Sequence, residues 1–171
     1  VHIDIDPSSI NKNVKVDLPI IGDVAEVITA TIKTIKKIKP NFVKSNKQNV
    51  SKWWEQIQKW RSINSFDFVN STETIKPQYA IQRLYELTKN KDTYITTEVG
   101  QHQMWAAQHY KFDKPNRWMT SGGLGTMGYG LPAAVGVQVA HPNKLVVDIA
   151  GEASVLMTMQ EMSTAVQYSL P

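Results

Sequence analysis

The amino-terminal part of the chain carries two hydrophobic patterns, one typical of a strand and one typical of a helix. Apolar and polar side chains alternate from Val1 to Ile5, and the Asp6-Pro7 pair ends the run, which predicts a strand that meets a turn. A short apolar run covers residues 18–22. Asp23 then stands in an N-cap position ahead of a helical stripe that reaches Lys39. Because the stripe is rich in β-branched residues, we expect its apolar face to be packed. The stripe consists of Val24, Val27, Ile28, Ile32, Ile35 and Ile38.

A change in composition separates this part from the helices that follow. Residues 40–50 are rich in Asn, Lys, Ser and Gln, which predicts a linker or a domain boundary. Ser51 stands where it can cap a helix with a large apolar face, which we interpret as a packing anchor. Residues 66–74 are expected to be irregular, and Pro77 opens a further helix. The apolar face consists of Trp53, Trp54, Ile57 and Trp60.

Beyond residue 92 the pattern alternates between short apolar runs and helical stripes. This alternation predicts an α/β fold, with a parallel sheet flanked by helices. Ligands of such sheets bind beyond the carboxyl ends of the strands, so the loops at Gly100, 122–128 and 151–154 are expected to line one crevice. The predicted strands cover residues 94–97, 118–120 and 144–150, and the predicted helices cover 101–110, 128–140 and 156–168.

Composition and charge narrow the possible functions. Of the 171 residues, 42% are hydrophobic and 20% are charged, which is typical of a globular protein. The net charge of +4 comes mainly from lysines scattered before residue 92 on a solvated face, so we expect no nucleic-acid partner. No apolar run is long enough to span a bilayer, so we expect no membrane association and a location in the cytoplasm or an organelle matrix such as a plastid. The absence of cysteine excludes disulfides and thiolate metal sites.

Glycine is concentrated in the stretch from Trp118 to Gly130. Since glycine loses more backbone entropy on folding than any other residue, this density indicates a backbone that approaches a ligand closely. Residues 123–128 match the pattern G-x-G-x-x-G, and Asp148 follows about 20 residues later, as in dinucleotide-binding sheets. A later glycine turn favours another ligand, because the Glu152 carboxylate and the Ser154 hydroxyl suit a magnesium ion that bridges to a diphosphate.

Several blocks of the chain resemble the large, catalytic subunit of acetolactate synthase, a thiamine-diphosphate-dependent enzyme family. These blocks cover residues 99–108, 121–128 and 151–154, and the part from Val99 to Gly128 is highly specific. Residues 1–7 and 21–24 resemble the end of the family's middle, FAD-binding domain. The resemblance implies a fragment with the tail of a Rossmann-like middle domain, a linker with the tryptophan-rich helix, and the first part of the thiamine-diphosphate domain. These parts would cover residues 1–39, 40–76 and 77–171.

The resemblance also implies which residues bind thiamine diphosphate. Gln101 and His102, at a helix start, would lie beside the diphosphate, where N–H donors stabilise negative charge. Gly125 would offer its carbonyl to the aminopyrimidine, and Met127 would bend the cofactor. Gly128 would allow close approach of the backbone. The full set implied is Gln101, His102, Gly125, Thr126, Met127, Gly128, Glu152, Ala153 and Ser154.

A metal ion and a flavin follow from the same resemblance. Glu152 would bind Mg²⁺, although the family usually has Asp here and the extra methylene lengthens the side chain by about 1.5 Å. Ala153 replaces a frequent glycine of the same motif. FAD, with a structural role, would be held by Asp4, Ile5, Asp23 and Val24.

The family decarboxylates pyruvate and adds the two-carbon unit to a second 2-keto acid, in the biosynthesis of valine, leucine and isoleucine. The resemblance implies a homodimer or homotetramer with a small regulatory subunit. The family's activating glutamate lies in an amino-terminal domain, so we expect residues 1–171 alone to be inactive. Three alternatives stay open: another thiamine-diphosphate-dependent decarboxylase, oxidase or carboligase; an NAD-binding Rossmann oxidoreductase; and a non-catalytic interaction module with an exposed Trp53-Trp54-Trp60 face.

Overall fold

A computed structural model describes all 171 residues, and the chain divides into two compact units. Residues 1–65 form the first unit and residues 66–171 form the second. The division falls inside the range 40–76 that we expected to link two domains. The assignment of the first unit to a flavin-binding domain stays a prediction.

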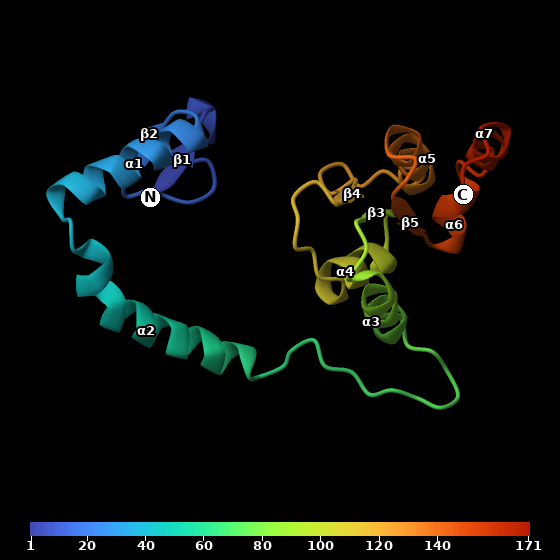
Figure 1. The fold of residues 1–171 in the computed structure, drawn as a ribbon, viewed down its shortest axis with the longest axis horizontal. Helices are drawn as coiled ribbons and strands as arrows, with labels where there is room; N and C mark the ends of the chain where they lie inside the picture. Colours follow the sequence, from blue (N-terminus) through green and yellow to red (C-terminus); the bar gives the residue numbers. More distant parts are fainter. The chain divides into compact units, whose positions relative to one another are not determined.

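The first unit opens with two short parallel strands and a helix (Figure 1). Strand β1 (His2–Asp4) pairs with β2 (Pro19–Ile21), and the 3-10 helix η1 (Pro7–Ser9) lies between them in the sequence. Helix α1 (Val24–Ile38) begins after Asp23, whose carboxylate accepts hydrogen bonds from the N–H groups of Ala25 and Glu26 at 2.9 and 3.2 Å. The strand predicted from period-two alternation and the Asp23 cap are therefore both confirmed.

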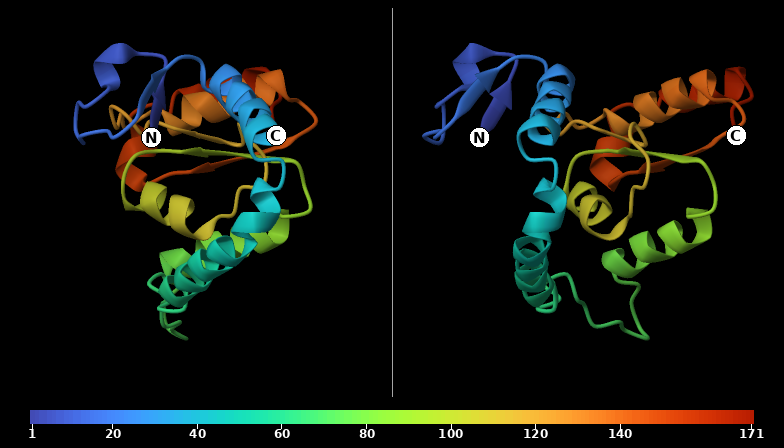
Figure 2. Two further views of the ribbon diagram at one scale, coloured as in Figure 1. Left: turned by 90° about the vertical axis from the view of Figure 1, so that its left-hand side faces the viewer. Right: turned by 60° about the vertical axis from the view of Figure 1, so that its left-hand side comes forward.

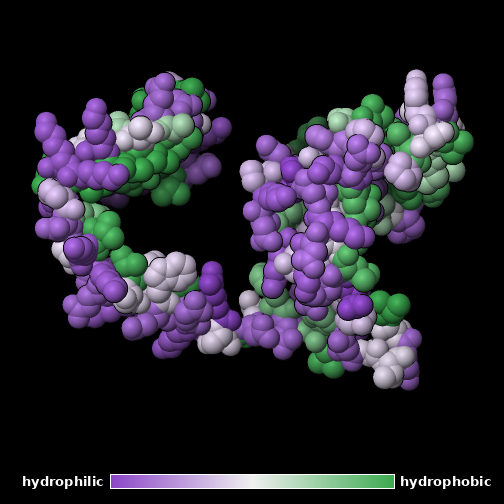
Figure 3. All heavy atoms as spheres, in the orientation of Figure 1, coloured by the Kyte–Doolittle hydropathy of each residue, from purple (hydrophilic) through white to green (hydrophobic).

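The apolar stripe of α1 is exposed rather than packed, contrary to our expectation. Ile28 and Ile32 are 46% and 48% exposed, and a band of apolar atoms follows this helix in Figure 3. No side chain of residues 1–65 is fully buried. The periodicity predicted the helix correctly, but this unit contains no surface that covers the stripe.

Helix α2 (Phe42–Arg61) corrects the predicted linker at residues 40–50. Lys and Gln are good helix formers, and neither Gly nor Pro interrupts residues 41–61, so the polar composition forms a solvated helix instead of a loop. The hydroxyl of Ser45 and the amide of Asn46 both donate to the carbonyl of Phe42 and reinforce its first turn. Ser51 consequently lies inside the helix and caps nothing.

The second unit follows the predicted alternation of strands and helices. Its three strands are all parallel, in the order β4-β3-β5, so the sheet predicted from the pattern is confirmed. The elements are α3 (Pro77–Thr88), β3 (Thr93–Thr97), α4 (Gln101–His109), β4 (Trp118–Thr120), α5 (Gly130–Ala140), β5 (Leu145–Ile149), α6 (Glu152–Leu156) and α7 (Glu161–Gln167).

Helices cover both faces of this sheet. Helices α3 and α4 lie on one face, and α5 and α7 lie on the other (Figures 1 and 2). Every residue of the central strand β3 is buried, as expected for a parallel strand covered on both sides. The core beneath α3 and α4 centres on Ile95, which is 0% exposed and packs with Ile81 and Tyr110.

The helix predicted over 156–168 begins later than expected. Helix α6 covers the preceding residues and ends at Leu156, and only α7, which begins at Glu161, falls within the predicted range. In the intervening turn the N–H of Met157 donates to the carbonyl of Ser154, and the hydroxyl of Thr158 donates to the carbonyl of Gly128 at 3.3 Å. This contact joins residues 30 positions apart in the sequence, so local periodicity could not predict the break. None of the helices combines the length and apolarity that a membrane span requires.

Candidate functional site

An open cleft lies at the carboxyl edge of the sheet in the second unit. Because β3, β4 and β5 are parallel, the loops that follow them leave the sheet at the same edge. All three loops contribute to a cleft of about 440 Å³, including His102 after β3, Met127 after β4 and Glu152 after β5. The predicted convergence of the three loops is confirmed. The lining residues are Val99, Gly100, Gln101, His102, Trp105, Met127, Ala150, Gly151, Glu152, Ala153 and Ser154.

Two glycines make room for the imidazole of His102. A Cβ added at Gly100 would lie 2.9 Å from His102 Cε1, and one added at Gly151 would lie 3.0 Å from the same atom. The ring therefore lies against the backbone of both the β3–α4 and the β5–α6 loops. Its Nε2 atom is buried and has no hydrogen-bond partner. A buried polar atom without a partner is costly, and here it belongs to a residue that lines the cleft.

The helices that begin near the cleft differ in whether the first backbone N–H groups have hydrogen-bond partners. Neither α4 nor α6 has a side-chain cap, so their first N–H groups are available to a ligand. Near the start of α5, in contrast, the N–H of Leu131 donates to the buried carboxylate of Glu98 at 3.1 Å. An anionic ligand would therefore be held at the starts of α4 and α6, where Gln101, His102, Ala153 and Ser154 lie.

The glycine-rich turn after β4 contributes one of its four predicted cofactor-binding residues to the lining of the cleft. Met127 lines the cleft, whereas Gly125, Thr126 and Gly128 lie in the same turn outside the lining. Gly125 and Gly128 have φ values of 77° and 86°, a backbone conformation that other residues rarely adopt. The N–H of Thr126 donates to the Ser121 hydroxyl at 2.9 Å, which closes the turn on itself.

A pair of acids lies beneath this turn. The Asp148 carboxylate accepts a hydrogen bond from the Thr96 hydroxyl at 2.9 Å. Burial, assisted by the charge of Glu98, raises the pKa of Asp148 to about 6. A Cβ added at Gly130 would lie 2.5 Å from Asp148 Oδ1 and 2.6 Å from the backbone nitrogen of Glu98, so only glycine fits there.

The charge of the cleft suits a ligand that carries its own metal ion. Glu152 is the single Asp, Glu, Lys or Arg side chain in the lining. No cluster of three or more His, Asp or Glu side chains capable of holding a metal occurs in the chain. Mg²⁺ is commonly bound by one or two carboxylates together with the phosphate oxygens of a ligand, and a lone Glu152 fits that arrangement.

The second unit matches a known domain family, and the whole chain has known relatives. Residues 98–171 match the family described as "Thiamine pyrophosphate enzyme, C-terminal TPP binding domain". The chain is related to acetolactate synthase large subunits. It is 47% identical over all 171 residues to the isozyme 3 large subunit of Escherichia coli (strain K12), of which it covers 29%. It is 48% identical over 170 residues to the large subunit of Buchnera aphidicola subsp. Schizaphis graminum (strain Sg) and 44% identical over 171 residues to that of Porphyra purpurea, covering 28% of each.

The relationship and the strand order argue against the dinucleotide-binding alternative. In that fold the strand before the glycine turn neighbours the strand that carries the acid. Here β3 separates β4 from β5, and Asp148 lies within β5 with its carboxylate directed to Thr96. The match of residues 123–128 to G-x-G-x-x-G therefore does not mark an NAD site.

Four residues of this site were not predicted from the sequence. Val99, Trp105 and Ala150 line the cleft, and Glu98 contacts the glycine-rich turn. An acid that directly follows a strand, two residues before a glycine that opens a helix, was a usable signal for Glu98. Trp105 had no such signal, because an aromatic residue on a short helix is usually a core residue.

The residues expected to hold FAD lie together in the first unit. Asp4 ends β1 and its carbonyl accepts a hydrogen bond from the N–H of Gly22, which follows β2. Asp4 and Ile5 therefore lie beside Asp23 and Val24 at the carboxyl ends of the paired strands. The side chain of Asp4 accepts from the N–H of Asp6, and that of Asp23 caps α1. A hollow of about 430 Å³ in this unit is lined by other residues, namely His2, Ser9, Lys12, Asn13, Val14 and Val16.

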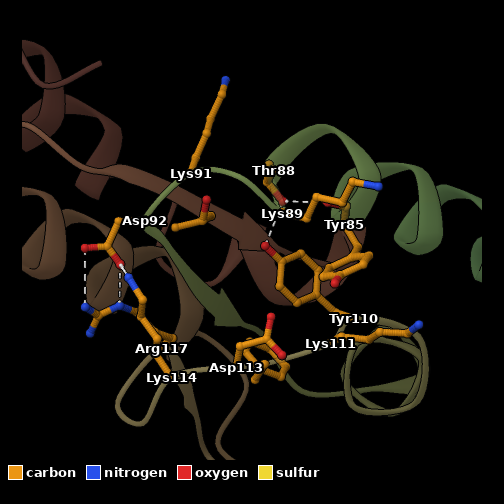
Figure 4. Close-up of a pocket in the computed structure, with 12 residues that line it drawn as sticks. Tyr85, Thr88, Lys89, Lys91, Asp92, Tyr110, Lys111, Asp113, Lys114 and Arg117 are labelled. Atoms are coloured by element: carbon orange, nitrogen blue, oxygen red, sulfur yellow. Dashed lines mark hydrogen bonds and ion pairs between the residues drawn. The ribbon is translucent and has the colours of Figure 1, made fainter.

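A smaller hollow of about 70 Å³ lies at the amino end of β3, away from the cleft (Figure 4). Asp92 is held there by Arg117 at 2.9 Å, with Lys144 at 3.1 Å and Lys114 at 3.3 Å. The hydrogen bond from Arg117 and the two lysines hold the pKa of Asp92 well below its usual range. This network ties together loops at the amino edge of the sheet, and none of the predicted site residues belongs to it.

Proposed function

We propose that this chain forms the thiamine-diphosphate-binding part of an acetolactate synthase large subunit. The protein to which it belongs would decarboxylate pyruvate and condense the two-carbon unit with a second 2-keto acid, in branched-chain amino acid biosynthesis. The observation that carries the proposal is the convergence of His102, Met127 and Glu152 on one cleft. The identity of 47% over the whole chain to an acetolactate synthase large subunit supports the same conclusion.

The residues of the cleft suit the two ends of this cofactor. The N–H groups at the starts of α4 and α6 would donate to the diphosphate, and His102 would supply a further polar atom beside it. Met127 would form an apolar wedge against the organic part, for which a flexible, polarizable side chain is suitable. When bound, thiamine diphosphate supplies the carbanion chemistry, and the protein supplies orientation and exclusion of water.

Magnesium would enter this site together with the cofactor. The lining contains no lysine or arginine to neutralise a diphosphate. A divalent ion held between the Glu152 carboxylate and phosphate oxygens would provide that charge. Glu152 reaches farther than the Asp usual in the family, so the turn would shift, a water molecule would intervene, or Mg²⁺ would bind more weakly.

FAD and partner subunits form the rest of the proposal. The adjacent ends of β1 and β2 would bind FAD through Asp4, Ile5, Asp23 and Val24, with a structural role. The large subunit would form a homodimer or homotetramer and would bind a small regulatory subunit. The chain spans about 29% of its relatives' length, so we expect residues 1–171 alone to form no acetolactate from pyruvate.

Calorimetric titration of the chain tests the cofactor assignment. We expect thiamine diphosphate to bind only when Mg²⁺ is present, and NAD to bind under neither condition. The substitution Glu152→Gln should weaken the binding in Mg²⁺ by about tenfold, since it removes the one acidic ligand. Glu86→Gln, on the exposed surface of α3, is the matched control and should have no effect. Binding of NAD without metal, or equal affinity of the Glu152→Gln variant, would contradict the assignment.

A further inference from the structure

Glu98 is a fully buried acid that the cofactor assignment does not use. It is 0% exposed, directly follows β3 and does not line the cleft. A buried carboxylate is stable only if its oxygens are hydrogen-bonded. Both oxygens of Glu98 are hydrogen-bonded. Oε2 accepts from the N–H of Gly128 at 2.6 Å, and Oε1 accepts from the N–H of Leu131 at 3.1 Å.

These two bonds hold the end of the glycine-rich turn at a defined position. Gly128 is fixed on its other side as well, because its carbonyl accepts a hydrogen bond from the Thr158 hydroxyl at 3.3 Å. A Cβ on Gly128 would lie 3.1 Å from Thr158 Cγ2, so the turn fits closely against this neighbour. The absence of a side chain at Gly130 lets the backbone of α5 approach the nitrogen of Glu98. The turn is thus held by Glu98, after β3, and by Thr158, in the turn between α6 and α7.

The peptide group that Glu98 binds is the one that joins Met127 to Gly128. Its orientation sets the direction in which the Met127 side chain leaves the backbone. Met127 lines the cleft and is 38% exposed, so contacts with other residues cover its side chain only in part. The side chain of Leu124, at the tip of the turn, is 92% exposed and is not held by packing.

We propose that Glu98 is a positioning residue, whose carboxylate fixes the Met127–Gly128 peptide and thereby the place of Met127 in the cleft. The consequence for thiamine diphosphate rests on the proposed function, whereas the anchoring of the turn does not. A carboxylate suits this role because it offers acceptors to two N–H groups at once. Gln would turn an NH₂ group toward one of these donors, and Asp would withdraw both oxygens by about 1.5 Å.

Amide hydrogen exchange of the chain without cofactor tests the anchor directly. In Glu98→Gln we expect the amides of Gly128 and Leu131 to exchange at least tenfold faster than in the unsubstituted chain, while those of β3 and α3 are unchanged. Glu98→Asp should give an intermediate rate, because it keeps the charge but loosens the contact. Glu86→Gln, which removes only an exposed ion pair with Lys89, is the control and should leave the rates of residues 125–131 unchanged. Unaltered exchange at residues 128 and 131 in Glu98→Gln would overturn the proposal.

Should Glu98→Gln unfold the second unit, Glu98→Asp decides the matter, because it keeps the carboxylate but withdraws both oxygens from their donors. Thr158→Val is compared with it, because it removes only the hydrogen bond to the carbonyl of Gly128. Faster exchange confined to residues 125–131 in Thr158→Val and Glu98→Asp would support the anchor. Unchanged exchange there in both variants would overturn it.

A double-mutant cycle on the affinity for thiamine diphosphate with Mg²⁺ tests whether Glu98 acts through Met127. We expect Glu98→Gln and Met127→Ala each to weaken binding by about tenfold, and the double variant to bind no more weakly than the weaker single variant. Additive losses would contradict action through Met127. If the unsubstituted chain does not bind thiamine diphosphate at all, the proposed function fails, and the exchange data still decide whether Glu98 anchors the turn.

Discussion

The two units of this chain contain similar elements but differ in what those elements bury. In residues 66–171, helices cover both faces of the sheet and Ile95 is completely shielded from solvent. In residues 1–65, the strands and helices form and Asp23 caps α1, yet no side chain is fully buried. Secondary structure therefore formed in both units, and a hydrophobic core formed in only one. The difference indicates that the apolar faces of the first unit need protein that residues 1–65 do not contain.

Separating the units is the strongest test of this comparison. We expect residues 66–171 alone to keep their helical circular dichroism and to unfold cooperatively on heating. Residues 1–65 alone should lose most helical signal at 25 °C, because isolated helices without tertiary packing are marginal in water. Cooperative thermal unfolding of residues 1–65 would show that the comparison is wrong.

Truncation of one isoleucine in each unit measures the same difference on the scale of single side chains. Ile95→Ala should lower the free energy of unfolding by about 2–5 kcal/mol, since Ile95 is 0% exposed. Ile28→Ala, at a position 46% exposed in α1, should cost less than about 0.5 kcal/mol. Urea denaturation followed by circular dichroism gives both values. A cost at Ile28 as large as that at Ile95 would mean that the stripe of α1 is covered in solution.

Within the second unit, the pKa of a carboxylate is raised near one edge of the sheet and lowered near the other. At the cleft edge, burial raises the pKa of Asp148 to about 6, so the folded chain binds more protons than the unfolded chain between about pH 4 and 6. The contribution of Asp148 to stability is therefore present below pH 4 and is lost as the pH rises through 6. Asp148→Asn should stabilise the chain at pH 7.5 by on the order of 1 kcal/mol, allowing for partial exposure, and should change little at pH 4.

Urea midpoints of the two proteins at both pH values provide the measurement. The comparison between proteins removes the contribution of the other titrating groups. An equal difference at pH 4 and pH 7.5 would show that the ionisation of Asp148 is not the cause.

The smallest effect is expected at the amino edge of the sheet, where Asp92 is surrounded by cations (Figure 4). The pKa of Asp92 lies below its usual range, so its contribution is present at neutral pH and is lost only in acid. Asp92→Asn should lower Tm slightly at pH 7, and less so in 1 M NaCl, because salt screens exposed charges. A loss of Tm that is independent of salt would point to hydrogen bonding rather than charge.

The site could be predicted from the sequence to the extent that its loops follow strands. Gly100, the turn at 122–128 and the turn at 151–154 each follow a predicted strand, and the parallel sheet then brings them to one edge. The place of Glu98 beneath the turn could not be predicted, because its bonds to Gly128 and Leu131 span 30 and 33 residues. The break between α6 and α7 depends on a contact of similar separation, from Thr158 to Gly128.

The sequence by itself determined the type of most elements, the cap at Asp23 and the parallel arrangement of the second unit, because these depend on side-chain periodicity and on residues a few positions apart. The polar composition of residues 40–50 was misleading, since a solvated helix and a linker share that composition. The tertiary structure alone decided that β3 lies between β4 and β5, which side chain anchors Gly128, and which apolar faces stay exposed. These features depend on strand pairing and packing between distant segments, and no local pattern records such pairings.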